Sequence, residues 1–428
     1  MRKSTIENNS IGEKLFVCEY DNGLKAFVLP KKGYTKKYAT YAAHYGSIDS
    51  QFVIPGEKEI TRVPDGIAHF LEHKLFAQKD GDVMDKYAAL GASSNAYTSF
   101  DHTAYLFSCS EEFQKCFALL IDFVQNPYIT DESVEKEKGI IGQEIRMYED
   151  NPNWKVFFNF LDALYKNHPV KIDIAGTAES IAVINKEILY KCYNTFYHPS
   201  NMIVFVAGDV NQDWIFESIA SNQKIKESKS NIKRIFPDEP REINKKIVEQ
   251  KMEVSAPLFI IGFKEDTAGA GPDYAMHSAG MNILMEMLLG KGSDLYTFLY
   301  EKGLITSNFD ADYTFESNYS YSTIGGESKN PEEVREIIIK ELNKIHSNGL
   351  DKESFERVKR MKIGSILKAL NSVDKIGHQF VASYMKGIEF FKMSDAYRNI
   401  KFDNVENIFK KHFVMDNIAM SVVRPTHP

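Results

Sequence analysis

The sequence predicts a mixed α and β protein made of two similar halves. With 428 residues the chain exceeds the ~100–200 residues of an ordinary domain. Short β-rich runs alternate with segments whose apolar residues recur at helical spacing, and landmarks of the first half recur in the second. The 43% hydrophobic and 26% charged composition is typical of a soluble globular protein. We therefore expect a chain that is folded nearly throughout.

The first half begins with predicted strands. LKAFVLP and ATYAAHYGSI, within residues 24–48, flank a lysine-rich turn and are rich in β-forming residues. A helix is expected from about Ile67, and a strand-like segment, SNAYTSFDHTAYLFSC, occupies residues 94–109. The next segment, EEFQKCFALLIDFVQ, places apolar side chains at helical spacing, which predicts an amphipathic helix.

The charged residues 221–250 predict a linker, since they include two prolines and few aromatic residues. They would separate an N-terminal half, 1–220, from a C-terminal half, 251–428. The halves look duplicated, because SNFDADYTFESNYSYSTI in the second resembles SNAYTSFDHTAYLF in the first, and DKESFERVKRMKIGSI resembles DESVEKEKGIIGQEI. The stretch AGMNILMEMLLGKG, expected to form the helix before the second copy, contains no histidine. Only the first half is therefore expected to hold a metal.

The charge and the ends of the chain limit the possible partners. A formal net charge of −7 offers no general attraction to nucleic acid or to an acidic membrane. The basic residues at the start are not followed by an apolar stretch, and no later segment has the ~18 apolar residues of a membrane helix. We expect a cytoplasmic protein whose four cysteines are buried, reduced thiols.

The segment GIAHFLEHKLF carries the residues with metal chemistry. On a helix, His69, Glu72 and His73 share one face, because His73 lies about 40° and Glu72 about 60° from His69 on opposite sides. Two imidazoles one turn apart can chelate Zn²⁺. Zinc lowers the pKa of a bound water to about 7, so the Glu72 carboxylate can act as its base. His-x-x-Glu-His is the inverted zincin pattern, although an ordinary helix could also carry these residues by chance.

A catalytic zinc site needs a third protein ligand, and the best candidate is Glu144. It lies in VEKEKGIIGQEIRMYEDNP, where helical spacing places Glu137 on the same face two turns earlier. The small and apolar residues between the two glutamates favour a carboxylate that faces inward. The alternative, a solvated helix with i,i+4 charge pairs, suits Glu135 and Lys138 but suits Glu144 poorly.

HFLEH, SSNAYTSFDHTAYLF and EKEKGIIGQE, in this order, resemble the insulinase and pitrilysin family of inverted-zincin metallopeptidases, above all the YmfH-like branch of small bacterial members. The resemblance implies two α+β halves, each a mostly antiparallel sheet covered by helices on one face. It further implies one Zn²⁺ per chain held by His69, His73 and Glu144, with Glu72 as catalytic base. Glu137 would support the site from outside the ligand set. The implied substrate strand, to which a peptide adds by backbone hydrogen bonds, comprises Ser94, Asn95, Ala96 and Tyr97, although a plain structural strand is the alternative.

The sequence departs from the family pattern in its second half. There the family carries an Arg and a Tyr that stabilise the oxyanion formed on the peptide carbonyl. In GSDLYTFLYEKGLITSN, Tyr300 stands where the Arg is expected and Thr306 where the Tyr is expected. Some small members work as heterodimers in which a metal-free homologue supplies this pair. The resemblance therefore implies such a paralogous subunit as partner, with a homodimer as the alternative.

The function implied by the resemblance is a zinc-dependent endopeptidase that cleaves peptides or small unfolded proteins inside a closed chamber. Two alternatives remain open. One is a non-catalytic assembly or binding subunit, against which the complete motif counts. The other is a maturation factor for one specific modified peptide or protein. No partner among nucleic acids or membranes is expected, and the sequence does not identify the substrate.

Overall fold

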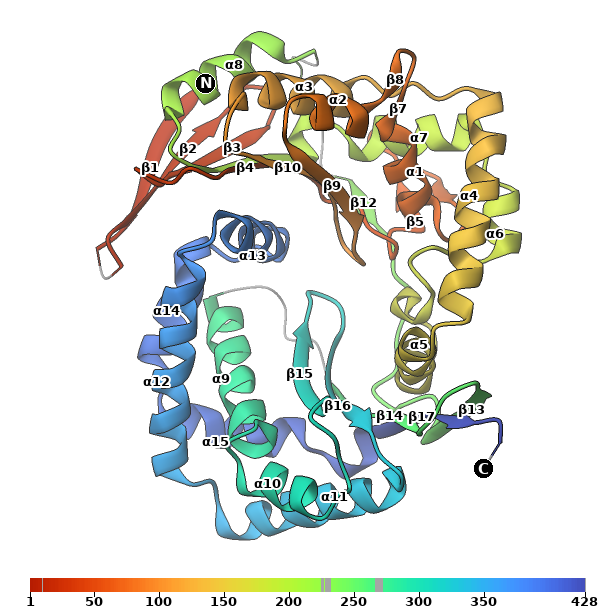
Figure 1. Ribbon diagram of the computed structural model, residues 1–428, viewed down its shortest axis with the longest axis vertical. Coiled ribbons are helices and arrows are strands. Elements are labelled where there is room, and N and C mark those ends of the chain that lie inside the picture. Colours follow the sequence, from red (N-terminus) through yellow and green to blue (C-terminus); the bar gives the residue numbers. More distant parts are fainter. Residues whose placement is uncertain (10, 225–226, 228–231, 266–271, 428) are drawn as a thin grey trace. The chain divides into compact units, whose positions relative to one another are not determined.

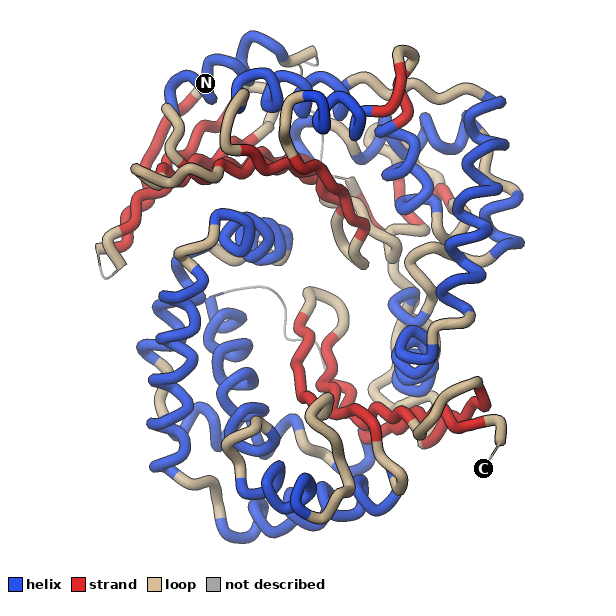
Figure 2. Tube along the Cα trace, in the orientation of Figure 1, coloured by secondary structure: helices blue, strands red, loops and turns tan. Residues whose placement is uncertain are grey.

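A computed structural model describes residues 1–9, 11–224, 227, 232–265 and 272–427 (Figure 1). The chain forms two compact units. The first comprises residues 1–145, 172–236 and 369–385, and the second comprises residues 146–171, 237–368 and 386–428. Both units combine helices and sheets (Figure 2).

The first unit is built on a seven-stranded sheet of order β1-β2-β3-β11-β4-β10-β9. All neighbours are antiparallel except β3 and β11. The strands of this unit are β1 (Arg2–Asn8), β2 (Glu13–Glu19), β3 (Lys25–Pro30), β4 (Lys37–Ala43), β5 (Gln51–Val53), β6 (Ile60–Arg62), β7 (Ala77–Gln78), β8 (Gly81–Asp82), β9 (Ser93–Thr98), β10 (Thr103–Cys109), β11 (Met202–Gly208) and β12 (Lys233–Arg234). Its helices are α1 (Ile67–Phe76), α2 (Val83–Ala89), α3 (Phe113–Gln125), most of α4 (Asp131–Glu149), α6 (Ala178–Ala182), α7 (Lys186–Phe196), α8 (Gln212–Asn222) and α13 (Val373–Met385), with a 3₁₀ turn at Pro199–Asn201.

Helices pack on both faces of this sheet. One face carries α3 and α8, and the amphipathic α3 buries Phe113 and Phe117 beneath it. The other face carries α13, whose Phe380 ring lies 4.8 Å from the ring of Phe27 and 4.3 Å from that of Phe205. Thus a helix from the C-terminal part of the sequence completes the core of the first unit.

The second unit has a five-stranded sheet of order β13-β17-β14-β16-β15. Its strands are β13 (Ile247–Met252), β14 (Leu258–Glu265), β15 (Asp310–Phe315), β16 (Ser320–Glu327) and β17 (Ile418–Pro425). Its helices are α5 (Pro152–Leu164), α9 (Pro272–Leu289), α10 (Asp294–Glu301), α11 (Pro331–Asn348), α12 (Lys352–Ala369), α14 (Phe390–Asn399) and α15 (Phe402–His412), with 3₁₀ turns at Pro169–Lys171 and Met415–Asn417.

Helix α5 comes from the N-terminal part of the sequence but belongs to the second unit. Asn151 caps it by accepting hydrogen bonds from the backbone of Asn153 and Trp154, and Pro152 occupies its first turn. The helix packs against β13, β14 and β17. Its contact with β14 is close, because a Cβ added at Gly262 would lie 2.5 Å from the Phe160 ring. Helices α5 and α13 are therefore exchanged between the two parts of the sequence.

The two sheets share one topology, which confirms the predicted duplicated α+β fold. In the order β13-β17-β14-β16-β15 the first pair is parallel and the others are antiparallel, as in β3-β11-β4-β10-β9. The prediction was incomplete in two respects. It placed helices on one face of each sheet, but α13 covers the face of the first sheet opposite α3. The helix α9 also starts before the stretch AGMNILMEMLLGKG and includes His277, so this helix does carry a histidine.

The predicted linker is partly structured. Residues 225–226 and 228–231 of it lie outside the described residues, but Lys233 and Arg234 pair with β5 and residues from Ile247 onward form β13. The compact units differ from the predicted division at 220 and 250 chiefly by the exchanged helices. The four cysteines are free and buried. Among the described residues, no helix combines the length and apolar composition needed to cross a bilayer.

Candidate metal centre

Helix α1 carries three of the predicted site residues in a buried position. It begins after Gly66, whose φ of 86° suits glycine, and a Cβ there would lie 2.4 Å from the carbonyl oxygen of Ala175. His69 and Glu72 are each only 8% exposed. The rings of His69 and His73 lie 4.6 Å apart, one turn from each other on the same face. The predicted helical arrangement of the motif is therefore present.

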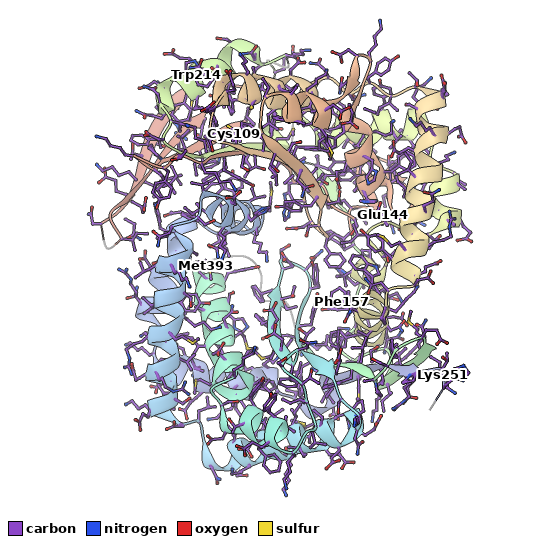
Figure 3. All side chains as sticks on the ribbon, in the orientation of Figure 1. Cys109, Glu144, Phe157, Trp214, Lys251 and Met393 are labelled. Carbon is purple, nitrogen blue, oxygen red and sulfur yellow. The ribbon has the colours of Figure 1, made fainter. Side chains whose placement is uncertain are left out.

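Helix α4 brings Glu144 to the two histidines. Figure 3 labels Glu144 on this helix. Its Oε1 lies 3.6 Å from Nε2 of His69, and its Oε2 lies 3.5 Å from Nε2 of His73. Two ligand atoms that each lie ~2.1 Å from a tetrahedral ion are about 3.4 Å apart. Among the described His, Cys, Asp and Glu residues, one group of three or more has ligand atoms that all lie within 4.8 Å of one another. This group is His69, His73 and Glu144. This donor set fits zinc.

Glu137 and Lys74 surround the histidine pair. Nδ1 of His73 lies 3.1 Å from Oε1 of Glu137, which fixes the ring with Nε2 directed at Glu144. The other Glu137 oxygen lies 3.5 Å from the ammonium of Lys74, a side chain that is only 1% exposed and also donates to the carbonyl of Ser133. Burial alone would raise the pKa of Glu137, but the His73 hydrogen bond and the Lys74 charge lower it. Glu137 is thus held as a carboxylate.

The two histidines differ in their electrostatic surroundings. Burial lowers the pKa of His69 to about 4, and the neighbouring His73 contributes to this effect. Burial would also lower the pKa of His73, but the hydrogen bond to Glu137 and the charges of Glu72, Glu137 and Glu144 raise it. The buried Nδ1 of His69 has no hydrogen-bond partner within the described part of the chain. The neutral imidazole of His69 is the form that binds a metal.

Glu72 is positioned by a residue of the neighbouring sheet. The hydroxyl of Thr98, at the end of β9, donates a hydrogen bond of 2.8 Å to Oε2 of Glu72. Burial raises the pKa of Glu72, and the Thr98 hydrogen bond opposes that rise. A buried carboxylate with a raised pKa, next to a candidate metal site, is suited to accept a proton near neutral pH.

The predicted substrate residues lie on β9, the last strand of its sheet. Ser94, Asn95, Ala96 and Tyr97 pair with β10 on one side, and on the other side β9 has no neighbouring strand among the described residues. These residues are exposed or half-buried. An open strand edge of this kind can accept an extended peptide. Tyr97 also packs against His102 and His378, with ring centroids 5.5 and 5.4 Å away.

Tyr300 and Thr306 lie in the second unit. The Tyr300 ring is half-exposed at the end of α10 and stacks on Tyr296 at 5.9 Å. The hydroxyl of Thr306 accepts a hydrogen bond from the backbone of Asn308 in the turn before β15. Both side chains have local structural contacts.

Sequence reasoning missed two residues next to the site. Thr98 follows the predicted substrate strand directly, and the alternation of side chains along a strand would have placed it on the face of Ala96. Lys74 follows the motif directly and lies in an apolar helix, which was a signal of burial. Neither pattern identifies the partner, because the partners Glu72 and Glu137 lie 26 and 63 positions away in the sequence.

Two protein-family models match most of the chain. Residues 60–178 match the model described as insulinase, peptidase family M16, and residues 184–362 match the peptidase M16 inactive domain. The first match contains all the predicted site residues. The second covers most of the part predicted to lack metal ligands.

Several known proteins are similar to this chain over about three quarters or more of its length. The chain is 43% identical to an uncharacterized zinc protease, YmfH, of Bacillus subtilis over 98% of its own length and 99% of that protein. A second Bacillus subtilis protein, the uncharacterized zinc protease YmxG, is 25% identical over 74% of this chain and 78% of its own. The crystal structure of a putative M16-like peptidase from Alicyclobacillus acidocaldarius matches with a TM-score of 0.94 and 35% identity, covering 99% of this chain and 100% of that one. A Helicobacter pylori protease shares the fold, with a TM-score of 0.81 at 20% identity over 96% of this chain and 100% of that one.

Proposed function

Because this chain belongs to the insulinase (M16) family of peptidases, we propose that it is a zinc-dependent endopeptidase acting on peptides or small unfolded proteins. The observation that carries the proposal is that the ligand atoms of His69, His73 and Glu144 lie within 4.8 Å of one another. The buried carboxylate of Glu72 lies on the same helix as the two histidines. These three residues would hold the zinc. When bound, zinc polarises a peptide carbonyl and lowers the pKa of a water molecule.

Glu72, Thr98 and Glu137 each have a separate role in the proposed reaction. Glu72 takes a proton from the attacking water and passes it to the leaving amine. Thr98 keeps the Glu72 carboxylate in one orientation through its 2.8 Å hydrogen bond. The Glu137 carboxylate accepts a hydrogen bond from Nδ1–H of His73 and thereby leaves Nε2 free to bind the metal.

The open edge of β9 supports a peptide substrate. A strand of substrate adding to Ser94–Tyr97 would use backbone hydrogen bonds, which are the same for every sequence. It would run beside Thr98, the residue that contacts Glu72. This arrangement brings a peptide bond to the catalytic carboxylate without requiring a particular side chain, so we propose broad sequence tolerance.

The test is hydrolysis of a quenched peptide pool by the zinc-loaded wild type and by Glu72→Gln. Glu132→Gln is the matched control, since Glu132 is exposed in the first turn of α4. We expect cleavage by the wild type and the control, and a loss of at least ~100-fold in Glu72→Gln with zinc still bound. Equal cleavage by all three would refute the role of Glu72.

We further propose that the active enzyme contains a paralogous, metal-free subunit. The motivating observation is the presence of Tyr300 and Thr306 where the family carries its oxyanion-stabilising Arg and Tyr. Adding such a homologue should raise kcat of the single chain by ~100-fold or more. A single chain that cleaves peptides as fast as the reconstituted pair would contradict the partner proposal while leaving the peptidase proposal intact.

A further inference from the structure

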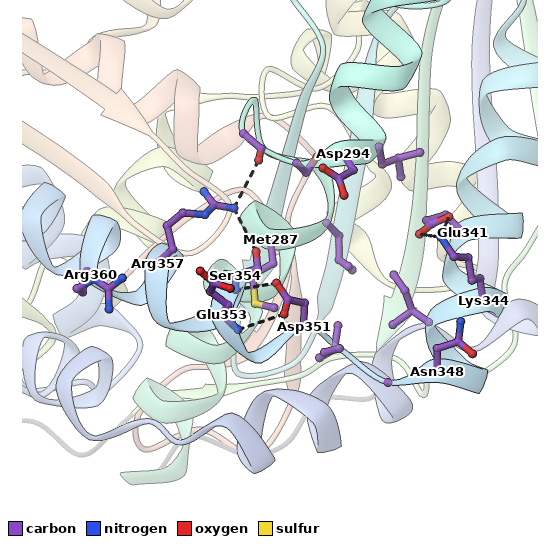
Figure 4. A pocket seen from close by; sticks show the side chains of 17 residues that line it. Met287, Asp294, Glu341, Lys344, Asn348, Asp351, Glu353, Ser354, Arg357 and Arg360 are labelled. Carbon is purple, nitrogen blue, oxygen red and sulfur yellow. Dashed lines mark hydrogen bonds and ion pairs between the residues drawn. The ribbon is translucent and has the colours of Figure 1, made fainter.

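The second unit contains a cavity at the junction of four helices (Figure 4). It has a volume of about 450 Å³ and lies where α9 and α11 end and where α10 and α12 begin. Ligand pockets in proteins measure ~300–1,000 Å³, so the cavity has the size of a site for a small molecule. All of its lining residues belong to the second unit, and it shares no residue with the candidate metal centre.

One part of the cavity lining is apolar. Met287 and Leu288 come from the last turn of α9, and Leu295 comes from the first turn of α10. Ile345, near the end of α11, and Leu350, just after this helix, complete the apolar part. All five side chains are buried or half-buried. This part of the lining can therefore remove an apolar group of a ligand from water.

Three charged residues of the lining are already engaged. Lys344 forms an ion pair with Glu341 at 3.1 Å. Asp351 caps α12, because its Oδ1 accepts a hydrogen bond of 3.2 Å from the backbone of Glu353 and its Oδ2 accepts one of 2.8 Å from that of Ser354. Figure 4 draws the ion pair and the cap. These three residues are therefore not the ones that we expect to bind a ligand.

Two arginines of α12 have no carboxylate partner among the described residues. Nη2 of Arg357 donates to the carbonyl of Gly292 at 3.4 Å and to the hydroxyl of Ser354 at 3.2 Å, both uncharged groups. Arg360 is exposed, and Figure 4 draws no contact for its guanidinium. A guanidinium has five N–H donors. Both arginines therefore retain donors for a ligand carboxylate, which arginine can bind through two parallel hydrogen bonds.

The lining also presents negative charge that has no cationic partner in the described part of the chain. Asp294 is exposed at the start of α10, where the Ser293 hydroxyl serves as the cap by accepting a hydrogen bond from the backbone of Tyr296. The Asp294 carboxylate is therefore not needed as the cap. Figure 4 shows it apart from the guanidinium groups of Arg357 and Arg360. A ligand ammonium can bind this carboxylate while a carboxylate of the same ligand binds the arginines.

We propose that this cavity binds a free amino acid with an apolar side chain, in its zwitterionic form. Arg357 and Arg360 would bind the carboxylate, Asp294 would bind the ammonium, and the apolar part of the lining would hold the side chain. A simple anion would be repelled by Asp294 and Glu353, and a simple cation would be repelled by the arginines. A ligand that carries both charges matches both parts of the lining.

Binding at this cavity goes beyond the proposed peptidase activity. The ligand would connect the junction of α9 and α10 with that of α11 and α12, and it would bind the folded chain but not the unfolded one. Its binding should therefore also raise the temperature of unfolding. Both effects are measured without any peptide cleavage, so failure of the proposed peptidase function would leave this proposal standing, and the reverse also holds.

Calorimetric titration of the full chain tests the proposal. The probes are L-leucine, L-leucinamide, which lacks the carboxylate, and N-acetyl-L-leucine, which lacks the ammonium. The test variants are Arg360→Met and Asp294→Asn, since neither side chain forms an ion pair in the described part of the chain. The control is Lys368→Met, because Lys368 is exposed on the same helix as Arg360 but does not line the cavity.

We expect saturable binding of L-leucine, and binding at least about tenfold weaker for each of the two blocked derivatives. Arg360→Met and Asp294→Asn should each weaken the binding of L-leucine at least about tenfold, and Lys368→Met should leave it unchanged. The proposal is overturned if L-leucine does not bind below about 10 mM. It is also overturned if either blocked derivative binds as tightly as L-leucine, or if both test variants bind as tightly as the control.

Discussion

Replacing Glu137 by glutamine should weaken zinc binding although Glu137 is not a ligand. The substitution keeps the size of the side chain and keeps an oxygen that can accept a hydrogen bond from Nδ1–H of His73. In the wild type this bond joins Nδ1 to Oε1 of Glu137 at 3.1 Å. It removes the negative charge that makes this hydrogen bond strong and that raises the basicity of the ring. It also leaves the ammonium of Lys74, which is 1% exposed, without its counter-charge.

The magnitude follows from the loss of one hydrogen-bonded charge next to a ligand. Outer partners of metal-binding histidines are worth 10–100-fold in metal affinity, or about 1.4–2.7 kcal/mol. The apoprotein should also lose stability, because Lys74 becomes an unpaired buried charge and removal of one partner from a buried pair costs ~3–5 kcal/mol. The two effects are separable, since the first is measured on folded protein.

The assay is competition for zinc with a chelator of known affinity, at a temperature where each variant is folded. Glu135→Gln is the matched control, because Glu135 lies on the same helix and pairs with Lys138 at the surface. We expect the Kd for zinc to rise 10–100-fold in Glu137→Gln and to stay unchanged in the control. An unchanged Kd in Glu137→Gln would refute the inference that Glu137 supports the metal through His73.

Three further predictions concern other contacts. Thr98→Val removes the hydrogen bond that opposes the rise in the pKa of Glu72. The acidic limb of the pH profile of kcat/KM should therefore move up by about one pH unit. An unmoved limb would contradict the inference that Thr98 acts on Glu72. Arg234→Ala leaves Asp49 buried and unpaired and should cost ~3–5 kcal/mol in urea unfolding, whereas Arg62→Ala in the same small sheet, where the side chain is exposed, should cost little. Burial lowers the pKa of His168 to about 4, whereas a histidine of the unfolded chain has a pKa near 6.5. As the pH falls below ~6.5, the unfolded chain binds a proton at this position before the folded chain does, so the free energy of unfolding should fall by about 2 kcal/mol by pH 5. His168→Gln should abolish this loss of stability.

The sequence predicted much of the candidate site because most of its residues are close in the sequence. His69, Glu72 and His73 lie within five residues, so the geometry of one helix is sufficient to bring them together. The prediction of Glu144 as a ligand depended on the spacing within α4 and on the family resemblance. Helix geometry alone does not tell how two separate helices pack against each other. The contacts of Thr98 and Lys74 could not be predicted, since each depends on how a strand or helix packs against a distant segment.

The duplication was visible in the sequence, but the exchange of helices was not. The matching segments around Asn95 and Asn308 predicted equivalent strand segments, and the structure shows that each segment is a hairpin of two strands, β9–β10 and β15–β16. An amphipathic helix shows which face it buries, but not against which sheet. Helices α5 and α13 therefore gave no sign that each completes the unit opposite to its place in the sequence.

The most direct test of the metal site is the zinc content of the chain after equilibrium dialysis. It should be measured by atomic absorption for the wild type, for Glu144→Gln and for Glu132→Gln as the control on the same helix. We predict about one zinc per chain in the wild type and the control, and a large loss in Glu144→Gln, because two imidazoles alone leave the site without its third ligand. A wild type that binds no zinc, or equal zinc in all three, would contradict the assignment of His69, His73 and Glu144.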